Sequence, residues 1–164
     1  MKALGALLLL TTTALAGDPG PSSGQALPDP KLTPGLADPS LTIEVICAKG
    51  WSTKTVRDVS SQLKRQVYSR YGMGGPRQGY CAVPEGCEVD HLISLTIGGS
   101  NDIRNLWPQP YPGVWGAHAK DRLEVHLRKL VCSGSITLEH AQSEISHDWI
   151  AAHRRYLGQT AAMR

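Results

Sequence analysis

The chain has 164 residues, with 17 lysines and arginines against 14 aspartates and glutamates and a formal net charge of +3 at pH 7. This length predicts one domain with one hydrophobic core. The charge is too mild to identify a nucleic-acid-binding protein by itself, because phosphate binding needs a local basic patch rather than a high total. After the first 16 residues no apolar run reaches membrane-spanning length, which excludes a permanently membrane-spanning chain there.

The first 16 residues have the composition of a secretory signal peptide. Lys2 supplies a positive charge, residues 3–10 are almost wholly apolar, and residues 14–16 read Ala-Leu-Ala, the small-residue pattern before a signal peptidase site. The apolar run is too short to span a bilayer as a permanent helix. We therefore expect cleavage before Gly17 and a secreted or periplasmic protein.

Residues 17–40 are expected to form a flexible or extended leader. The segment contains six prolines, with glycine and serine between them and few apolar residues. Such a composition buries too little surface to offset the entropy lost on ordering. The single folded domain is predicted to span residues 41–158, followed by a frayed tail over residues 159–164.

The first part of the domain should contain one extended segment and two short helical elements. Residues 41–47 are β-branched and partly alternating, which favours a strand or an extended segment. Residues 52–56 predict a capped helical turn, and residues 60–71 predict a helix with a serine N-cap. The glycines and prolines of residues 72–86 predict a loop.

Residues 87–110 predict a β-hairpin, and the expected function depends on it. Its first strand, expected to continue to position 93, alternates, so Asp90 and His91 should point to opposite faces unless they lie at a strand end, a twist or a bulge. Residues 98–102, Gly-Gly-Ser-Asn-Asp, predict a turn. The prolines of residues 108–112 should then exclude regular structure for several residues.

Two helices should complete the domain. Residues 116–131 hold an apolar stripe, and His118 and Arg122 project from the opposite side. A histidine near a helix N-terminus can take part in a phosphate site, because the unpaired N–H groups there attract anions. The helix over residues 137–158 has its own apolar stripe, and three histidines outside that stripe are expected at the surface: His140, His147 and His153.

Four cysteines in an exported chain predict two disulfides rather than free thiols: Cys47, Cys81, Cys87 and Cys132. A zinc cluster is the competing interpretation, but the chain has no Cys-x-x-Cys motif and its spacings are irregular. All three pairings are possible. We favour Cys81 with Cys87 as a local clamp beside the hairpin, and Cys47 with Cys132 as a long connection.

Four short motifs occur in the order and spacing of a known nuclease family: Asp90-His91, Gly98-Gly99, Asn105-Leu106, and His118 with Lys120. This set resembles the HNH endonucleases, which have the ββα-metal fold. The core resemblance covers residues 88–131, and residues 33–158 more loosely resemble small exported bacterial proteins that carry this module. It implies an α+β protein in which a small HNH-like hairpin-plus-helix module is surrounded by additional helices and stapled by disulfides.

The resemblance assigns a role to each matching residue. Asp90 and His118 would be metal ligands, His91 the general base, and Asn105 the residue that orients the loop. A neutral histidine can take a proton from water near pH 7, because its reference pKa is about 6.5. The two disulfides would replace the structural zinc that many members bind through paired Cys-x-x-Cys motifs.

The predicted helix over positions 116–131 offers alternative metal ligands and residues that could contact the phosphate. Asp121 and Glu124 are alternative ligands, and Arg122 or Lys120 would neutralise the scissile phosphate. The cofactor would be one divalent metal ion. Mg²⁺ comes first because it prefers oxygen ligands, and Mn²⁺, Ni²⁺ and Zn²⁺ are alternatives because a histidine nitrogen favours them.

The expected function is that of an exported, metal-dependent endonuclease that hydrolyses phosphodiester bonds of nucleic acid, DNA ahead of RNA. We expect a monomer and no membrane partner after signal cleavage. The alternative is an exported protein that binds nucleic acid or envelope and keeps the hairpin and metal site without catalysis. A third interpretation is a disulfide-stapled structural domain whose histidines bind metal only incidentally.

Overall fold

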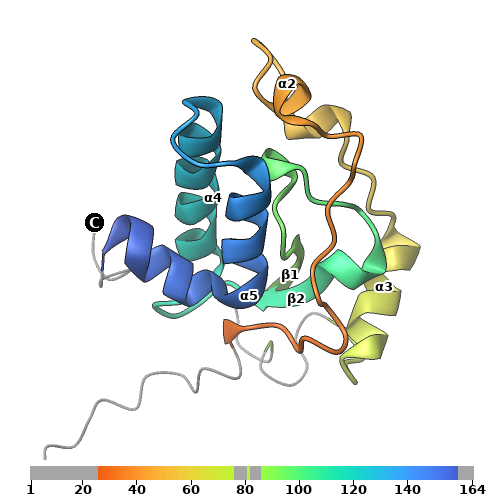
Figure 1. Ribbon diagram of the computed structural model, residues 1–164. Helices are drawn as coiled ribbons and strands as arrows, with labels where there is room; N and C mark the ends of the chain where they lie inside the picture. The colour runs from red at the N-terminus through yellow and green to blue at the C-terminus, as the bar shows by residue number, and fades with distance from the viewer. Residues whose placement is uncertain (1–25, 76–80, 82–85, 159–164) are drawn as a thin grey trace, which may run out of the picture.

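The structure, a computed structural model, describes residues 26–75, 81 and 86–158. Within this part of the chain, an antiparallel two-stranded hairpin lies among four α-helices, which confirms the α+β fold class (Figure 1). No helix in the described ranges is long and apolar enough to cross a membrane. The helices are α2 (Ile43–Ile46), α3 (Ser61–Arg70), α4 (Ala117–Cys132) and α5 (Leu138–Leu157).

The hairpin consists of β1 (Cys87–His91) and β2 (Leu106–Pro110). β1 ends at His91 rather than at position 93, and the prediction that prolines exclude regular structure after position 107 is wrong. Both strands of a two-stranded sheet are edge strands, where proline is tolerated if the missing N–H would face away from the partner. Pro108 and Pro110 alternate with Trp107 and Gln109, so the ladder keeps N–H donors at every second position.

The predicted turn, residues 98–102, lies between two short 3₁₀ helices, η3 (Leu95–Ile97) and η4 (Ile103–Asn105). Gly98 has φ of 78°, a left-handed conformation that glycine adopts without a steric cost. A Cβ at Gly99 would lie only 1.7 Å from the carbonyl oxygen of Ile93. The Gly-Gly pair therefore permits both the reversal and the close contact of two backbone segments.

Residues 43–46 form a helical turn, so the prediction of a strand or an extended segment over residues 41–47 is wrong. Its β-branched residues favour a strand, but tertiary contacts override this weak preference. A single turn of α2 buries Ile46 completely, and the Ile46 carbonyl accepts hydrogen bonds from Arg128 Nε at 3.2 Å and Nη2 at 2.7 Å. The predicted helix after the serine cap is confirmed, with Ser60 Oγ accepting from the N–H of Leu63 at 3.1 Å.

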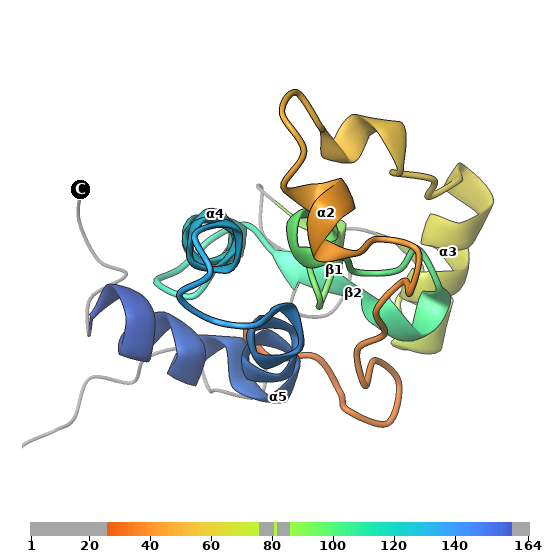
Figure 2. The ribbon, with the colours of Figure 1, turned by 45° about the horizontal axis from the view of Figure 1, so that its top comes forward.

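The helices α4 and α5 lie side by side (Figure 1 and Figure 2) and provide most of the core. α5 bends at Asp148, whose φ of −159° and ψ of 94° are not helical. The Asp148 carboxylate accepts from the N–H groups of Ile150 and Ala151, at 2.9 Å each, so it caps the second half of the helix. Between the halves, the indole N–H of Trp149 donates to the carbonyl of Ala26 at 2.9 Å.

Both favoured disulfide pairs are confirmed. Cys47 and Cys132 have Cα atoms 5.5 Å apart, and Cys81 and Cys87 have Cα atoms 5.2 Å apart. The first pair joins the end of α2 to the end of α4 across 85 positions of sequence, and the second closes a short loop beside β1. The hairpin and α4 are thus each tied covalently to a neighbouring segment.

The described part of the proline-rich leader, residues 26–40, packs against the domain. The Thr33 hydroxyl lies 2.9 Å from the carbonyl of Leu106, to which it donates, and 2.7 Å from the Tyr71 hydroxyl. The N–H of Gly35 donates to the carbonyl of Arg104 at 3.1 Å. Composition alone suggests flexibility, but partners outside the segment order it. The expected signal peptide, residues 17–25 of the leader and the expected tail lie outside the described residues.

His153 is buried, so the prediction that all three histidines of α5 lie at the surface is wrong. It is 1% exposed, its ring centroid lies 5.3 Å from that of Trp115, and neither ring nitrogen has a hydrogen-bond partner. His153 follows the buried Trp149 by four positions, about one helical turn, so both side chains lie on the inward face of the helix. Burial, with the charge of Arg122 as the smaller cause, lowers the pKa of His153.

We expect His153→Phe to make folding less sensitive to acid. Because the folded-state pKa of His153 lies below the ordinary value of 6.5, the unfolded chain binds the proton more readily. The stability tied to this residue is therefore present above about pH 6.5 and lost as the pH falls through the folded value. Urea midpoints at pH 7.5 and pH 5.5 should differ less for His153→Phe than for wild type. His147→Gln, at an exposed position of the same helix, is the control, and equal acid losses in all three proteins would contradict the expectation.

Candidate functional site

Asp90 and His91 occupy the last two positions of β1. As alternation along a strand predicts, their side chains have different partners. The carboxylate of Asp90 meets Lys120 on α4, whereas the ring of His91 meets Asn101 in the turn that follows the strand. The two side chains thus belong to adjoining but distinct polar clusters.

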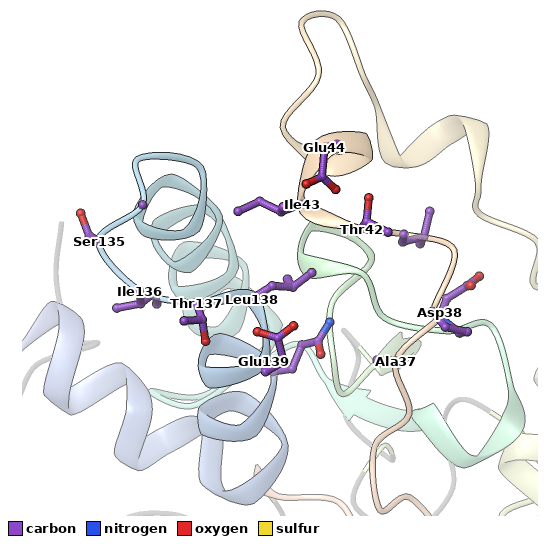
Figure 3. A pocket seen from close by; sticks show the side chains of 14 residues that line it. Ala37, Asp38, Thr42, Ile43, Glu44, Ser135, Ile136, Thr137, Leu138 and Glu139 are labelled. Atoms are coloured by element: carbon purple, nitrogen blue, oxygen red, sulfur yellow. The ribbon is translucent and has the colours of Figure 1, made fainter.

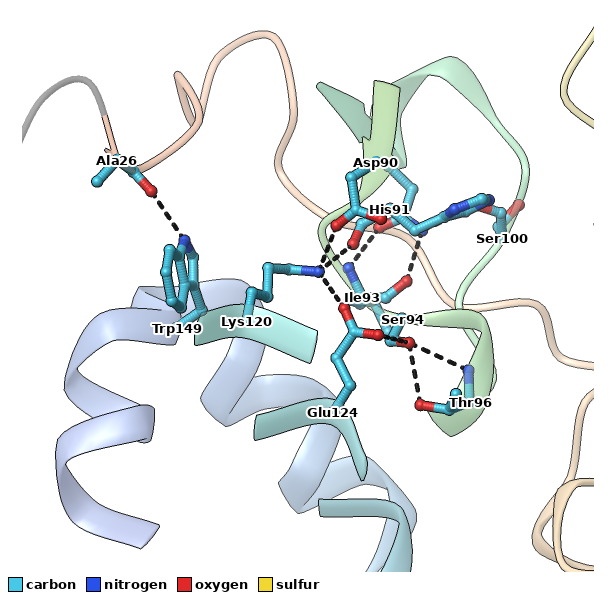
Figure 4. Close-up of polar contacts among 11 residues, drawn as sticks. Ala26, Asp90, His91, Ile93, Ser94, Thr96, Ser100, Lys120, Glu124 and Trp149 are labelled. Carbon is cyan, nitrogen blue, oxygen red and sulfur yellow. Dashed lines mark hydrogen bonds and ion pairs between the residues drawn. The ribbon is translucent and has the colours of Figure 1, made fainter. Parts of the chain in front are cut away.

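Lys120 forms the centre of the first cluster. Its ammonium donates to the Asp90 carboxylate at 2.7 Å, to the carbonyl oxygen of His91 at 2.6 Å and to the Glu124 carboxylate at 2.5 Å. In Figure 4 these side chains converge between β1 and α4. The hydroxyl of Ser94 donates to the second oxygen of Glu124 at 2.6 Å. We call Asp90, Lys120, Glu124 and Ser94 the lysine cluster.

The lysine cluster is buried and charged. The side chain of Lys120 is 0% exposed, that of Asp90 17% and that of Glu124 12%. Burial acts to lower the pKa of Lys120, but the charges of Asp90 and Glu124 outweigh it, so the pKa is raised. Burial raises the pKa of Glu124 to about 6, against the opposing effect of Lys120. At pH 7 the Lys120 ammonium and the Glu124 carboxylate are therefore ionised.

Asn101 holds the His91 ring in one tautomer. The Asn101 side-chain N–H₂ donates to the carbonyl of Val56 at 2.7 Å, and its oxygen accepts from the N–H of Asp58 at 3.2 Å. These bonds fix which end of the amide faces the ring. His91 Nε2 lies 3.0 Å from the Asn101 oxygen, so Nε2 carries the hydrogen and Nδ1 keeps its lone pair.

His91 is neutral at pH 7. Its burial, the largest cause, lowers the pKa, and the charges of Arg57 and Lys120 lower it further, while Asp90 and Asn101 oppose them. A neutral imidazole with an unprotonated Nδ1 is the form that a general base requires. The residue is 2% exposed, so the ring lies beneath the surface of the folded chain.

Asn105 is fully buried and bonds to four backbone groups around the turn. Its oxygen accepts from the N–H groups of Ile93 at 2.9 Å and Leu36 at 3.2 Å. Its side-chain N–H₂ donates to the carbonyls of Ile93 at 2.9 Å and Ser100 at 2.8 Å. The amide therefore holds the two ends of the hairpin loop together, and it acts on His91 only through the backbone.

His118 and Arg122 lie away from Asp90 and His91. The side chain of His118 is 79% exposed, and its Nδ1 lies 3.7 Å from the carboxylate of Asp121. No hydrogen bond or ion pair joins His118 to Asp90. Arg122 is exposed, and its charge acts on His153 rather than on His91.

The predicted metal site needs Asp90 and His118 to face one ion-sized space. The charged partner of Asp90 is instead the ammonium of Lys120, and His118 pairs with Asp121. Nowhere in the described ranges do three or more His, Cys, Asp or Glu side chains gather as a metal-binding group. The donor set at Asp90 therefore does not fit the metal ion that the resemblance implies.

The sequence-based assignment does not include Asn101. It gives Lys120 and Glu124 other roles, those of a phosphate-neutralising residue and an alternative metal ligand. Lys120 and Glu124 lie four positions apart on α4, and Lys120 precedes the buried Leu123 and Leu127 by three and seven positions. Extending the apolar stripe towards the N-terminus of the helix would have placed Lys120 inward. Asn101 gave no such signal, because its contacts with distant segments exist only in the folded chain.

A cavity lies elsewhere, between residues 37–44 and the segment that joins α4 to α5 (Figure 3). Its volume is about 640 Å³, and neither His91 nor the lysine cluster lines it. Its lining has three acidic side chains, Asp38, Glu44 and Glu139, and no lysine or arginine. An acidic lining repels phosphate, so this cavity is not a candidate for the predicted chemistry.

The two clusters at the end of β1 are thus the main candidates for a functional site in the described residues. One is a buried ion network, and the other is a histidine with a fixed tautomer. Comparison of the chain with models of known protein families, with curated proteins and with solved structures gives no match.

Proposed function

We propose that the protein is an exported endonuclease of the HNH type, which hydrolyses phosphodiester bonds of nucleic acid, DNA ahead of RNA. The observation that carries this proposal is the state of His91, which is neutral and held in one tautomer at the end of β1. A hairpin followed by a helix and an asparagine that fixes the hairpin loop support it further.

In the proposed reaction, His91 is the general base. Its Nδ1 takes a proton from the water that attacks phosphorus. The bond from phosphorus to the leaving oxygen breaks, its electron pair stays on that oxygen, and the resulting alkoxide takes a proton from solvent water. The Asn101 oxygen, 3.0 Å from Nε2, stabilises the imidazolium that results, because it accepts the hydrogen on the other nitrogen. General-base catalysis of this kind contributes typically about 10²- to 10⁴-fold to the rate.

Arg57 is the candidate for binding the scissile phosphate. Its side chain is exposed, and it lies close enough to His91 for its charge to lower the histidine pKa. It stands between Val56 and Asp58, whose backbone groups Asn101 binds, so the segment that carries Arg57 is tied to the segment that holds the base. A guanidinium can bind two phosphate oxygens at once.

The mechanism contains no metal-dependent step. Asp90 and His118 were the predicted metal ligands, but they do not face a common space. The Asp90 carboxylate forms an ion pair with the ammonium of Lys120 instead. The charge beside the phosphate comes from Arg57 in the proposed arrangement. Asp90 acts on His91 as a nearby negative charge that raises its pKa against the effect of burial.

Binding of nucleic acid without cleavage is a second candidate, favoured by one observation. His91 is 2% exposed, so the folded chain leaves little room for water and substrate at Nδ1. In that function, Arg57 and neighbouring basic residues would hold the phosphate backbone, and the hairpin would serve as a rigid support. A cleavage assay separates the two functions.

We expect the oxidised protein to nick supercoiled plasmid, and His91→Ala to reduce the rate by about 10²- to 10⁴-fold. Gel electrophoresis of time courses, with EDTA and separately with Mg²⁺, Mn²⁺, Ni²⁺ or Zn²⁺, measures the rate. His147→Ala is the matched control, because His147 is an exposed histidine on α5. Circular dichroism checks that each variant is folded.

Three results are informative. Loss of cleavage in folded His91→Ala but not in His147→Ala supports the proposed base. Equal cleavage by wild type and His91→Ala contradicts the assignment of His91. Retained binding of plasmid with no cleavage under any ion condition contradicts the nuclease function and supports the binding function.

A further inference from the structure

We propose that the Lys120 ammonium is the resident cation of the Asp90 site and closes this site to divalent metal ions. The inference deepens the proposed function, on which its catalytic consequence rests: cleavage would not need a metal ion at Asp90. It begins from the three contacts of Lys120, which lie at the junction of β1 and α4.

The ammonium is fully satisfied by the protein. It has three N–H donors, and three oxygens accept from it at 2.5 to 2.7 Å: Asp90 Oδ2, His91 O and Glu124 Oε1. The side chain is 0% exposed, so water does not compete for these contacts. The ammonium therefore takes the place of a bound cation, with one positive charge and three oxygens at hydrogen-bond distance.

A divalent ion cannot take the position among Asp90 Oδ2, His91 O and Glu124 Oε1 without displacing this ammonium. Displacement would leave a buried positive charge next to a second, larger positive charge, or force the Lys120 side chain out of the core. Breaking a buried ion pair in this way is strongly unfavourable. We therefore expect the site to bind divalent ions at least ~100-fold more weakly than the same oxygens would without the lysine.

The oxygens that surround the ammonium form a metal site once the lysine is removed. Two carboxylates and one backbone carbonyl are hard oxygen donors, the class that Ca²⁺ and Mg²⁺ prefer. Their distances from the ammonium nitrogen, 2.5 to 2.7 Å, are close to the Ca²⁺–oxygen distance of about 2.3–2.6 Å. Ca²⁺ thus needs less rearrangement here than Mg²⁺, whose oxygens lie at about 2.0–2.1 Å.

The test is a titration of wild type, Asp90→Asn and Lys120→Ala with Ca²⁺ and Mn²⁺ by isothermal titration calorimetry, without nucleic acid. We expect wild type and Asp90→Asn to behave alike, because Asp90 is not a ligand in the native protein. Lys120→Ala should bind one Ca²⁺ per chain, at least ~100-fold more tightly than wild type. Terbium luminescence excited through Trp107, the cross-strand neighbour of Asp90, gives an independent readout.

Two results would overturn the proposal. One is a divalent ion bound by wild type and lost in Asp90→Asn, which would make Asp90 a native ligand. The other is folded Lys120→Ala that binds Ca²⁺ no more tightly than wild type. If Lys120→Ala is unfolded without ions, refolding on addition of Ca²⁺ supports the proposal. If it stays unfolded with Ca²⁺, the comparison of wild type with Asp90→Asn decides.

The failure of this inference can be distinguished from the failure of the proposed nuclease function. The titrations contain no nucleic acid, so their result stands whether or not the protein cleaves. If the protein does cleave plasmid, the inference predicts that cleavage continues in EDTA. Cleavage that needs a divalent ion, together with loss of that ion's binding in Asp90→Asn, would refute the inference and leave the nuclease function intact.

Discussion

Lys120→Met is expected to lower the free energy of unfolding by about 3–5 kcal/mol at pH 8. The substitution keeps the length and the apolar part of the side chain but removes the charge that neutralises Asp90 and Glu124. Two carboxylates would then remain in an environment where they are 17% and 12% exposed, next to a carbonyl that has lost its donor. Urea denaturation followed by circular dichroism measures the loss.

The control for this prediction is Lys129→Met, on the exposed side of α4. It removes the same charge from the same helix and should change stability by no more than about 0.5 kcal/mol. At pH 5 the loss in Lys120→Met should be smaller, because a buried carboxylate without its cation takes up a proton. Equal, small losses in both variants would show that the lysine cluster contributes little to stability.

Removal of the disulfide between Cys47 and Cys132 is expected to have the second large effect. The bridge joins positions 85 apart, and the chain-entropy relation for a loop of that size gives about 4–5 kcal/mol. The bridge between Cys81 and Cys87 spans a separation of 6, for which the same relation gives about 2 kcal/mol. The long bridge should therefore matter about twice as much.

The matched pair of double variants, Cys47→Ala/Cys132→Ala and Cys81→Ala/Cys87→Ala, tests this difference. Each loses one bridge and keeps the other, so the loop length is the main variable. Urea midpoints of the oxidised proteins should rank wild type first, the short-bridge variant second and the long-bridge variant last. The reverse order of the two variants would show that local packing outweighs loop entropy.

Local patterns predicted most of the elements. Amphipathic spacing located α3, α4 and α5, and serine or threonine caps located the starts of α3 and α5. The Gly-Gly pair located the turn between the strands. These features depend on neighbouring residues, so the sequence contains the information that decides them.

Residues 41–47, the prolines of β2 and His153 were predicted wrongly for a common reason. Each is decided by contacts with distant parts of the chain: Arg128 on the Ile46 carbonyl, β1 beside Pro108 and Pro110, and Trp115 beside His153. Propensity and periodicity describe one segment at a time. They do not describe a contact with a residue far away in the sequence, such as that between Ile46 and Arg128.

The candidate site divides in the same way. The sequence by itself determined which chemical groups stand at the end of the first strand, and strand alternation already separated Asp90 from His91. Only the tertiary structure decided what each of them meets: Lys120 for Asp90 and Asn101 for His91, with His118 left at the surface. The physical reason is the position of α4, because docking this helix in the core buries a lysine where two carboxylates and a backbone carbonyl accept its three N–H donors.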